Sequence, residues 1–313
     1  MKRISAILCF VLSFFLSSAL GATVNRAERS VPGEYIIALK EGVPAVSTAF
    51  ELAGLFEGEI ITTYAEPLPG FAIRLPLKSS EELAMRLAAD PRVAMIEENA
   101  IALLADSTIV GPPEYPNLNL WHVDRIDQVS LGSARLDDSY SYATTGSGVR
   151  IYVVDSGVRP DHAEFQGRVD PAPDLQQTML DAGLSHGAPC WESIHNPESS
   201  HGTSVASVAA GKKFGVARMA TIVDARAFNC FGDADAVHIN KVLEWIIQDP
   251  NRQISGTSSW YPSVVNLSFA FSKYEEGMTT TNAWIDTLVN TYNIKVVSAA
   301  GNIPWAPSTT LQE

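Results

Sequence analysis

The stretch that decides the fold is residues 151–158, which read I-Y-V-V-D-S-G-V. Its four apolar residues, mostly β-branched or aromatic, indicate a strand buried on both faces of a parallel sheet. The run ends at Asp155, and the carboxyl ends of such strands border the ligand crevice of open α/β sheets. Asp155 is therefore a candidate functional carboxylate, although capping of a turn or helix is the commoner reason for a single Asp there.

Strands and helices alternate around this stretch, from about residue 149 to residue 299. Strands are predicted at residues 149–154, 221–228, 263–269 and 294–299, and helices at residues 200–211, 236–248 and 280–290. This alternation predicts an α/β domain with a parallel sheet covered by helices on both faces.

Residues 31 to about 105 form a separate unit. Strands are predicted at residues 34–40, 57–64, 70–75 and 93–98, with helices at residues 44–55 and 79–89. The order βαββαβ is that of a ferredoxin-like α+β sandwich, which is shared by many functions. Residues 106–120 follow with the composition of a linker, including Gly111-Pro112-Pro113.

The N-terminus has the features of a secretory signal peptide over residues 1–21. Positive charge is followed by an apolar run at residues 4–16, too short to span a bilayer, and then by small residues. An uncleaved membrane anchor is the alternative. We expect a secreted protein that loses Cys9 with the signal, which leaves Cys190 and Cys230 either as one disulfide or as buried thiols.

The charge balance argues against two classes of partner. The 313 residues carry 22 basic and 35 acidic side chains, a net charge of −13. A chain without a basic surplus has little affinity for nucleic acid or for an anionic membrane surface. We expect a monomer with neither partner.

Two further motifs follow Asp155. His201 begins the run H-G-T-S-V-A-S, whose small residues indicate a helix that starts at the imidazole and packs closely. Asn302 ends V-V-S-A-A-G-N, where a side-chain amide could donate to an oxyanion or simply form a turn. His162 is predicted to be structural, and four further histidines are predicted to be surface or scaffold residues: His122, His186, His195 and His238.

The order Asp, His, Asn along the chain is that of the subtilisin-type active site. With these motifs, V-P-G-E-Y-I-I-A-L-K and D-P-R-V-A-M-I-E-E-N, the sequence resembles the secreted subtilisin-like serine proteases, nearest to the proteinase K group. The resemblance implies a ferredoxin-like inhibitory propeptide at residues 22–110. It also implies a subtilisin-like peptidase domain at residues 111–313 that lacks its C-terminal part.

The resemblance also implies roles for individual residues. Asp155 would orient His201, which would act as general base and then acid, while Asn302 would hold the oxyanion. The backbone of Ser268, Phe269 and Ala270, and the segment around Gly232, would pair with an extended protein or peptide substrate. Ala300 and Gly301 would line the pocket for the residue before the cleaved bond. Cys230 stands where some relatives carry a cysteine bridged to one near the histidine, which makes Cys190 its expected partner.

Several features depart from the family pattern. Residues 269–271 read F-A-F in place of L-G-G, which predicts an altered substrate pocket. The loop at residues 170–200 is long and unfamiliar. No calcium ligands can be assigned, and no cofactor is expected.

The nucleophile is the gravest departure. The family's serine follows the oxyanion Asn in a G-T-S-x-A-x-P motif, but this sequence ends at Glu313. Residues 202–206 and 256–262 resemble that motif but precede Asn302, so Ser204 and Ser258 are rejected. We expect an incomplete secreted serine endopeptidase, inactive alone, made as a zymogen that is cleaved between about Leu104 and Pro113. The alternative is a non-catalytic protein that inhibits or binds proteases through its propeptide-like unit.

Overall fold

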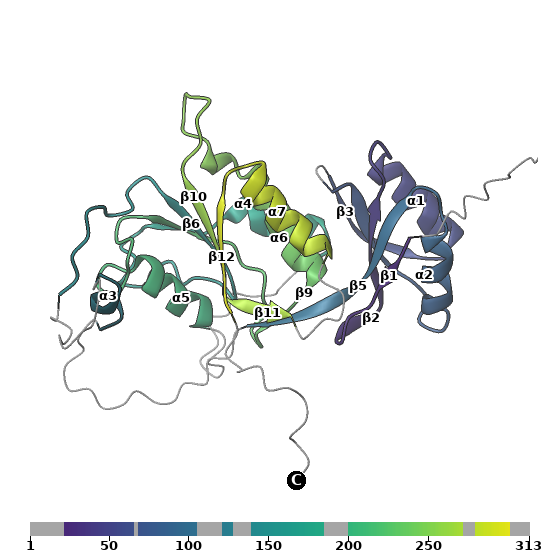
Figure 1. Ribbon diagram of the computed structural model, residues 1–313, viewed down its shortest axis with the longest axis horizontal. Helices are drawn as coiled ribbons and strands as arrows, with labels where there is room; N and C mark the ends of the chain where they lie inside the picture. The colour runs from purple at the N-terminus through teal and green to yellow at the C-terminus, as the bar shows by residue number, and fades with distance from the viewer. Residues whose placement is uncertain are drawn as a thin grey trace, which may run out of the picture.

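The computed structural model describes residues 22–65, 68–104, 121–127, 139–184, 200–271 and 279–300. They build a seven-stranded and a five-stranded sheet, each with its own helices, which lie side by side in Figure 1. No helix within these ranges is long and apolar enough to cross a membrane.

The N-terminal unit, residues 22–104, has the predicted βαββαβ order over residues 30–104, preceded by a two-residue strand that the sequence did not predict. Its strands are β1 (Val24–Asn25), β2 (Ser30–Leu39), β3 (Glu59–Tyr64), β4 (Gly70–Arg74) and β5 (Val93–Leu104), and its helices are α1 (Ala45–Leu55) and α2 (Ser80–Ala88). The order across the sheet is β1-β5-β2-β4-β3. Alternate strand residues such as Ile37, Phe71 and Ile96 form one apolar core with Leu52 of α1 and Leu87 of α2.

The second unit contains the predicted parallel sheet. Its strands are β6 (Arg150–Val154), β7 (Val169–Asp170), β8 (Thr221–Asp224), β10 (Ser263–Leu267) and β12 (Lys295–Ser298), in the order β12-β10-β6-β8-β7. Every pair in it is parallel. β8 is shorter than the predicted strand at residues 221–228, because the N–H groups of Ala227 and Phe228 donate to the carbonyl of Asp155 instead.

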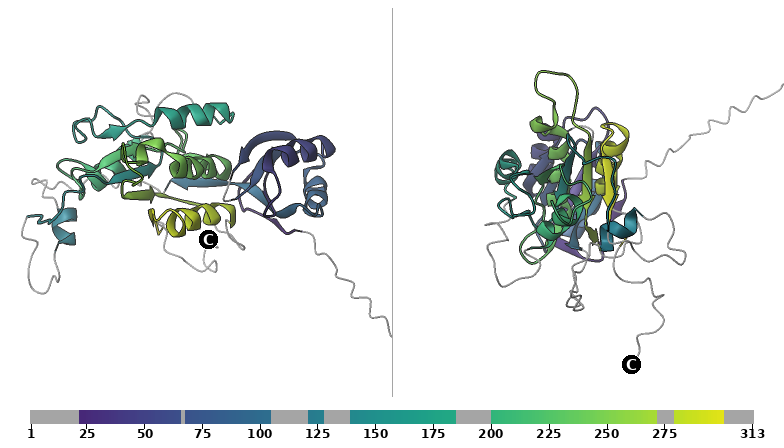
Figure 2. Two further views of the ribbon diagram at one scale, coloured as in Figure 1. Left: turned by 90° about the horizontal axis from the view of Figure 1, so that it is seen from above. Right: turned by 90° about the vertical axis from the view of Figure 1, so that its left-hand side faces the viewer.

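Both faces of this sheet are covered, as predicted, and β6 at its centre is buried at all five residues. Tyr152 and Val154 share a core with α4 (Pro173–Asp181), α6 (Ala236–Gln248) and α7 (Thr279–Asn290). Ile151 and Val153 face the other way and pack against α5 (His201–Ala210). The left-hand view of Figure 2 shows this sheet and its helices from above.

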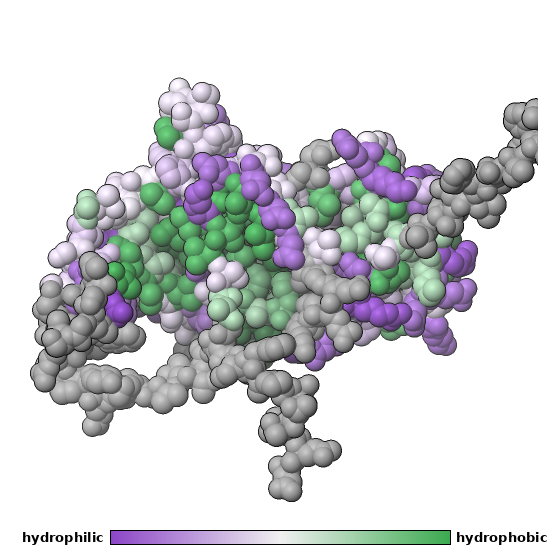
Figure 3. Space-filling view, in the orientation of Figure 1, coloured by the Kyte–Doolittle hydropathy of each residue, from purple (hydrophilic) through white to green (hydrophobic). Residues whose placement is uncertain are grey.

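Two further short elements are α3 (Trp121–Ile126) and η3 (Pro250–Arg252). Figure 3 shows apolar side chains gathered over β12, where Val297 is 56% exposed. β12 is an edge strand of the described sheet, so its side chains are less covered than those of β6.

Helix α5 approaches the sheet through a glycine. A Cβ at Gly202 would lie 2.5 Å from the carbonyl oxygen of Gly157 and 3.0 Å from the Cβ of Asp155. A side chain there would push α5 away from the end of β6, because interiors are packed without spare room.

The two units meet along a seam between β5 and the N-termini of α6 and α7. Asn99, fully buried, accepts from the N–H of Val237 at 3.1 Å and donates to Glu34 at 2.9 Å. Glu97 Oε2 accepts from the N–H of Thr280 at 3.0 Å, while its Oε1 has no partner within the described ranges. The contacts with Val237 and Thr280 therefore join the first sheet to the starts of two helices of the second unit.

Burial makes the Glu97 contact dependent on pH. A helix N-terminus favours a negative charge, but burial outweighs the hydrogen bonds from Thr280 and Thr279 and raises the pKa of Glu97 to about 7. In a separated unit, that pKa would return toward 4.5. The docked unit thus holds a proton that the separated unit releases, so docking is strongest below about pH 4.5 and weakens as the pH rises through 7.

We predict that the seam opens more often at alkaline pH, and that Glu97→Gln removes most of this difference. Hydrogen exchange of the seam amides, corrected for intrinsic rates, should report roughly 10- to 100-fold more opening at pH 8 than at pH 5.5 in the wild type. Glu98→Gln is the control, because Glu98 accepts from Ala27 within the N-terminal unit. Equal pH dependence in both variants would contradict this assignment.

A second prediction compares two helical glycines. Gly202→Ala should destabilise the protein by about 1–3 kcal/mol, because its Cβ would overlap the carbonyl of Gly157. In exposed Gly54 of α1 the same change meets no atom within 4 Å, and should stabilise by about 0.5–1 kcal/mol through helix propensity. Urea unfolding measures both, and two shifts of the same sign would refute the steric argument.

Candidate active site

Asp155 and His201 form a buried hydrogen-bonded pair. His201 Nδ1 lies 2.8 Å from Asp155 Oδ1 and 2.9 Å from Oδ2, and the Asp155 side chain is fully buried. Asp155 directly follows the central strand β6, and His201 is the first residue of α5, as the sequence predicted. This contact fixes the imidazole ring and leaves Nε2 as the nitrogen to exchange a proton with a reactant.

The turn after β6 holds the carboxylate in place. The N–H of Ser156 donates to Asp155 Oδ1 at 2.7 Å, and Ser156 Oγ accepts from the N–H of Gly202 at 3.2 Å. From the other side, the N–H groups of Ala227 and Phe228 donate to the Asp155 carbonyl at 3.0 and 3.1 Å. The pair is thus fixed from the helix and from the chain that follows β8.

Three strand ends converge at this edge of the sheet. Leu267 of β10 lies opposite Val154 of β6 and Ser298 of β12. The residues that follow these strands, including Ser268 and Ala300, therefore lie at the same edge as Asp155. The predicted site residues Gly301 and Asn302 lie outside the described residues.

The end of β5 lies between two strands of the second unit, which the sequence analysis did not predict. β9 (Asp233–Asp235) and β11 (Phe269–Phe271) flank it, and both pair with it in antiparallel fashion. Residues 101–103 lie opposite β9, and residues 102–104 lie opposite β11. The Leu104 N–H donates to the Gly232 carbonyl at 3.1 Å. The segments around Gly232 and at Phe269-Ala270 thus hold an extended strand of this same chain.

Aromatic side chains form the floor under this strand. Ala102 and Leu104 are buried in the same apolar core as Phe228 and Phe269, whose ring centroids are 5.0 Å apart. Phe271 packs edge-on against Phe269 at 6.0 Å. Bulky rings therefore stand beside the bound strand in the F-A-F segment.

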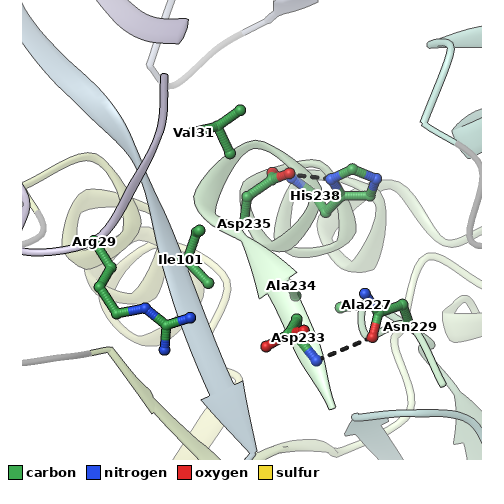
Figure 4. Close-up of a pocket in the computed structure, with 9 residues that line it drawn as sticks. All are labelled: Arg29, Val31, Ile101, Ala227, Asn229, Asp233, Ala234, Asp235 and His238. Carbon is green, nitrogen blue, oxygen red and sulfur yellow. Dashed lines mark hydrogen bonds and ion pairs between the residues drawn. The ribbon is translucent and has the colours of Figure 1, made fainter. Parts of the chain in front are cut away.

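A pocket of about 320 Å³ opens beside the bound strand, lined by residues of both units (Figure 4). Ile101 and Arg29 come from the N-terminal unit, and Asp233, Asp235 and His238 come from β9 and the start of α6. Asp235 caps α6 and accepts from His238 Nδ1 at 2.9 Å. Burial raises the pKa of Asp235, but the bonds and charge of His238 outweigh it, so the pKa lies below its ordinary value.

Some of the remaining cysteines, serines and histidines singled out in the sequence lie among the described residues, and others lie outside them. Cys230 is disulfide-bonded, whereas Cys190 lies outside the described residues. Ser204 is exposed on α5, and Ser258 precedes the amino end of β10, at the opposite edge of the sheet from Asp155. His122 and His162 bond to backbone atoms of Phe214 and Glu164. His186 and His195 are outside the described ranges.

One buried carboxyl group near the pair was not predicted. Asp224 is the last residue of β8 and Asp155 directly follows β6, so the same strand-end pattern could have identified Asp224. Burial raises the pKa of Asp224 to about 7, with a smaller lowering by Val158 and Arg226 and a further rise from Asp155. Within the described ranges, no group of three or more His, Cys, Asp or Glu side chains could hold a metal ion.

Comparison with known proteins gives relatives of one kind. The chain is 30% identical over 303 residues to an extracellular serine proteinase of Thermus sp. (strain Rt41A), covering 88% of this chain and 62% of that one. It is 31% identical over 217 residues to alkaline serine exoprotease A of Vibrio alginolyticus, covering 69% and 35%. The chain thus spans between about a third and two thirds of these relatives' lengths.

Solved structures agree on the fold. Fervidolysin from Fervidobacterium pennivorans, a keratinolytic enzyme related to subtilisin, superposes with a TM-score of 0.57 at 18% identity, covering 90% of this chain and 42% of that one. A mutant of the epidermin leader peptide processing serine protease from Staphylococcus aureus gives a TM-score of 0.52 at 16% identity, covering 86% of this chain and 60% of that one. The model of the subtilase family matches residues 146–312, more than half of the sequence. The chain belongs to the subtilase family.

Proposed function

We propose that this chain is the N-terminal and catalytic Asp–His part of a secreted serine endopeptidase that is made as a zymogen. The observation that carries the proposal is the strand at residues 101–104, held on both sides by β9 and β11 beside Asp155 and His201. Strand addition of this kind binds a peptide through its backbone and leaves its side chains to be selected by pockets. Protein and peptide chains are therefore the proposed substrates.

The proposed reaction is acyl transfer from a peptide bond to a serine. Asp155 orients His201 and stabilises its imidazolium, and Nε2 takes the proton of the serine and returns it to the leaving amine. Asn302 donates to the tetrahedral oxyanion, a contribution of roughly 3–4 kcal/mol. Ala300 and Gly301 line the pocket for the residue before the cleaved bond. The serine itself is not assigned to any residue of the given sequence.

Residues 22–110 are the proposed propeptide, and residues 1–21 its signal. The end of β5 occupies the place that a substrate strand would take, so the N-terminal unit would act as an intramolecular inhibitor. In the secreted protein, Cys190 is the proposed partner of disulfide-bonded Cys230. It would tie the chain before the histidine helix to the chain beside Gly232.

The second candidate function is a non-catalytic inhibitor or binder of proteases. It is favoured by one observation: neither Ser204 nor Ser258 lies where it could attack a peptide held between β9 and β11. The N-terminal unit would then supply the inhibitory strand.

The complete secreted product of the gene separates these candidates. We predict hydrolysis of a denatured protein substrate and labelling by a fluorophosphonate, with a loss of at least 10³-fold in kcat/KM in His201→Ala. His162→Ala is the control, since the contacts of the His162 ring within the described ranges are to Glu164 and Phe165 of its own loop. A wild-type product that hydrolyses nothing, but blocks an added subtilase, would replace the endopeptidase proposal by the second candidate.

The strand register also predicts the activation site. Leu104 lies opposite Phe269, one residue beyond Ser268, and Ser268 follows the strand end that lies beside the end of β6. We predict cleavage within two residues after Leu104, at the N-terminal limit of the range expected from composition. N-terminal sequencing of the mature secreted protein tests this, and a mature N-terminus near Pro113 would contradict the register argument.

A further inference from the structure

The candidate pair has a second buried carboxyl group behind it. Asp224 is 3% exposed and lies opposite Val153, on the strand next to β6. Residues two apart on a strand share a face. Asp155 therefore shares the α5 face with Val153, and Asp224 shares it with Ile222. The two carboxyl groups thus project from neighbouring parallel strands toward the same helix.

Asp224 is tied to the turn that carries the pair. The backbone N–H of Val158, the residue that ends the turn begun by Ser156, acts on the carboxyl group of Asp224 and lowers its pKa. Its Oδ1 has no hydrogen-bond partner in the described part of the chain. A buried polar atom without a hydrogen bond lowers the stability of the folded protein by about 1–3 kcal/mol. The presence of a carboxyl group at this position therefore needs an explanation.

Hydrogen bonding favours a negative charge on the carboxyl group of Asp155 over one on that of Asp224. Asp155 accepts from Ser156 N–H and from His201 Nδ1, whereas Asp224 Oδ1 accepts from no donor among the described residues. Two neighbouring buried carboxyl groups do not both ionise readily, and the one with more donors holds the charge. The remaining proton therefore belongs on Asp224.

Few other charges face Asp224. Arg226 follows β8, and burial lowers its pKa while the charge of Asp224 raises it. On the neighbouring strand β7, Asp170 pairs with Arg150 at 2.7 Å. Arg168 bonds to the carbonyls of Ala210 and Ala220, at the far end of α5. The groups that act on Asp224 are thus Asp155, with His201 behind it, and Arg226.

We propose that Asp224 is a positioning residue of the Asp155–His201 pair, which fixes the turn at residues 156–158 through Val158 and couples its own proton to that of His201. While Asp224 is neutral, one negative charge stands behind the imidazole. Once it ionises, a second charge favours the imidazolium. The inference rests on the proposed function of the pair, but its test needs no catalysis.

The test is proton NMR of the ¹⁵N-histidine-labelled 313-residue chain. His201→Gln identifies the low-field Nδ1–H resonance of the pair. In Asp224→Asn, which keeps an acceptor for Val158 but cannot ionise, that resonance should remain. The midpoint of the His201 titration should fall by about one pH unit, a tenfold change in proton affinity. In wild type the two groups should titrate as a coupled pair.

Asp224→Ala removes the acceptor as well, so the resonance should broaden or disappear while the fold survives. Asp174→Ala is the matched control, since Asp174 of α4 also carries an unpartnered oxygen but bonds to Trp245, away from the pair. An unchanged resonance and midpoint in both Asp224 variants would overturn the proposal. The same result in a hydrolytically active full protein would leave the proposed function standing, so the two failures are distinguishable.

Discussion

The hydrogen bond between Asp155 and His201 depends on a close approach of two backbones. His201 reaches the carboxylate only because Gly202 lets the first turn of α5 lie against the turn after β6, where a Cβ would be 2.5 Å from a carbonyl oxygen. Ala206 and Ala210 continue the contact along the helix as small, fully buried side chains. The pair is therefore a property of how α5 packs on the sheet, since an outward shift of a few tenths of an ångström would lengthen its hydrogen bonds.

The elements that the sequence predicted best are those with strong local patterns. The runs of β-branched residues in β6 and β10 are buried strands in the structure, the similar run in β12 is a largely exposed edge strand, and the βαββαβ order of residues 30–104 is present. α4 carries a local signal that was not used: Leu175 and Met179 are buried one helical turn apart. The loop expected at residues 170–200 therefore contains a helix that its own apolar spacing indicates.

Other elements have no local signal at all. The segments D-A-D and F-A-F are too short to show a strand pattern, and they pair only because the end of β5 lies between them. Asp155 and Asp224 pose the same difficulty for a different reason. Both follow a buried apolar run, and only contacts from distant segments, to His201 in one case and to Val158 in the other, distinguish them.

The seam between the units carries several buried polar atoms that have no partner among the described residues. Tyr64 Oη, Glu97 Oε1 and Trp284 Nε1 all lie there, and the Tyr64 and Trp284 rings are 6.4 Å apart. Each of these unpartnered atoms destabilises the closed seam by about 1–3 kcal/mol. This penalty disappears when the seam opens and the atom can bond to water. The hydrogen-bonded pairing of β5 with β9 and β11 stabilises the closed seam against this destabilisation. Cutting the chain after Leu104 would free the end of that ladder to fray, and the cost of the buried polar atoms would then favour separation of the units.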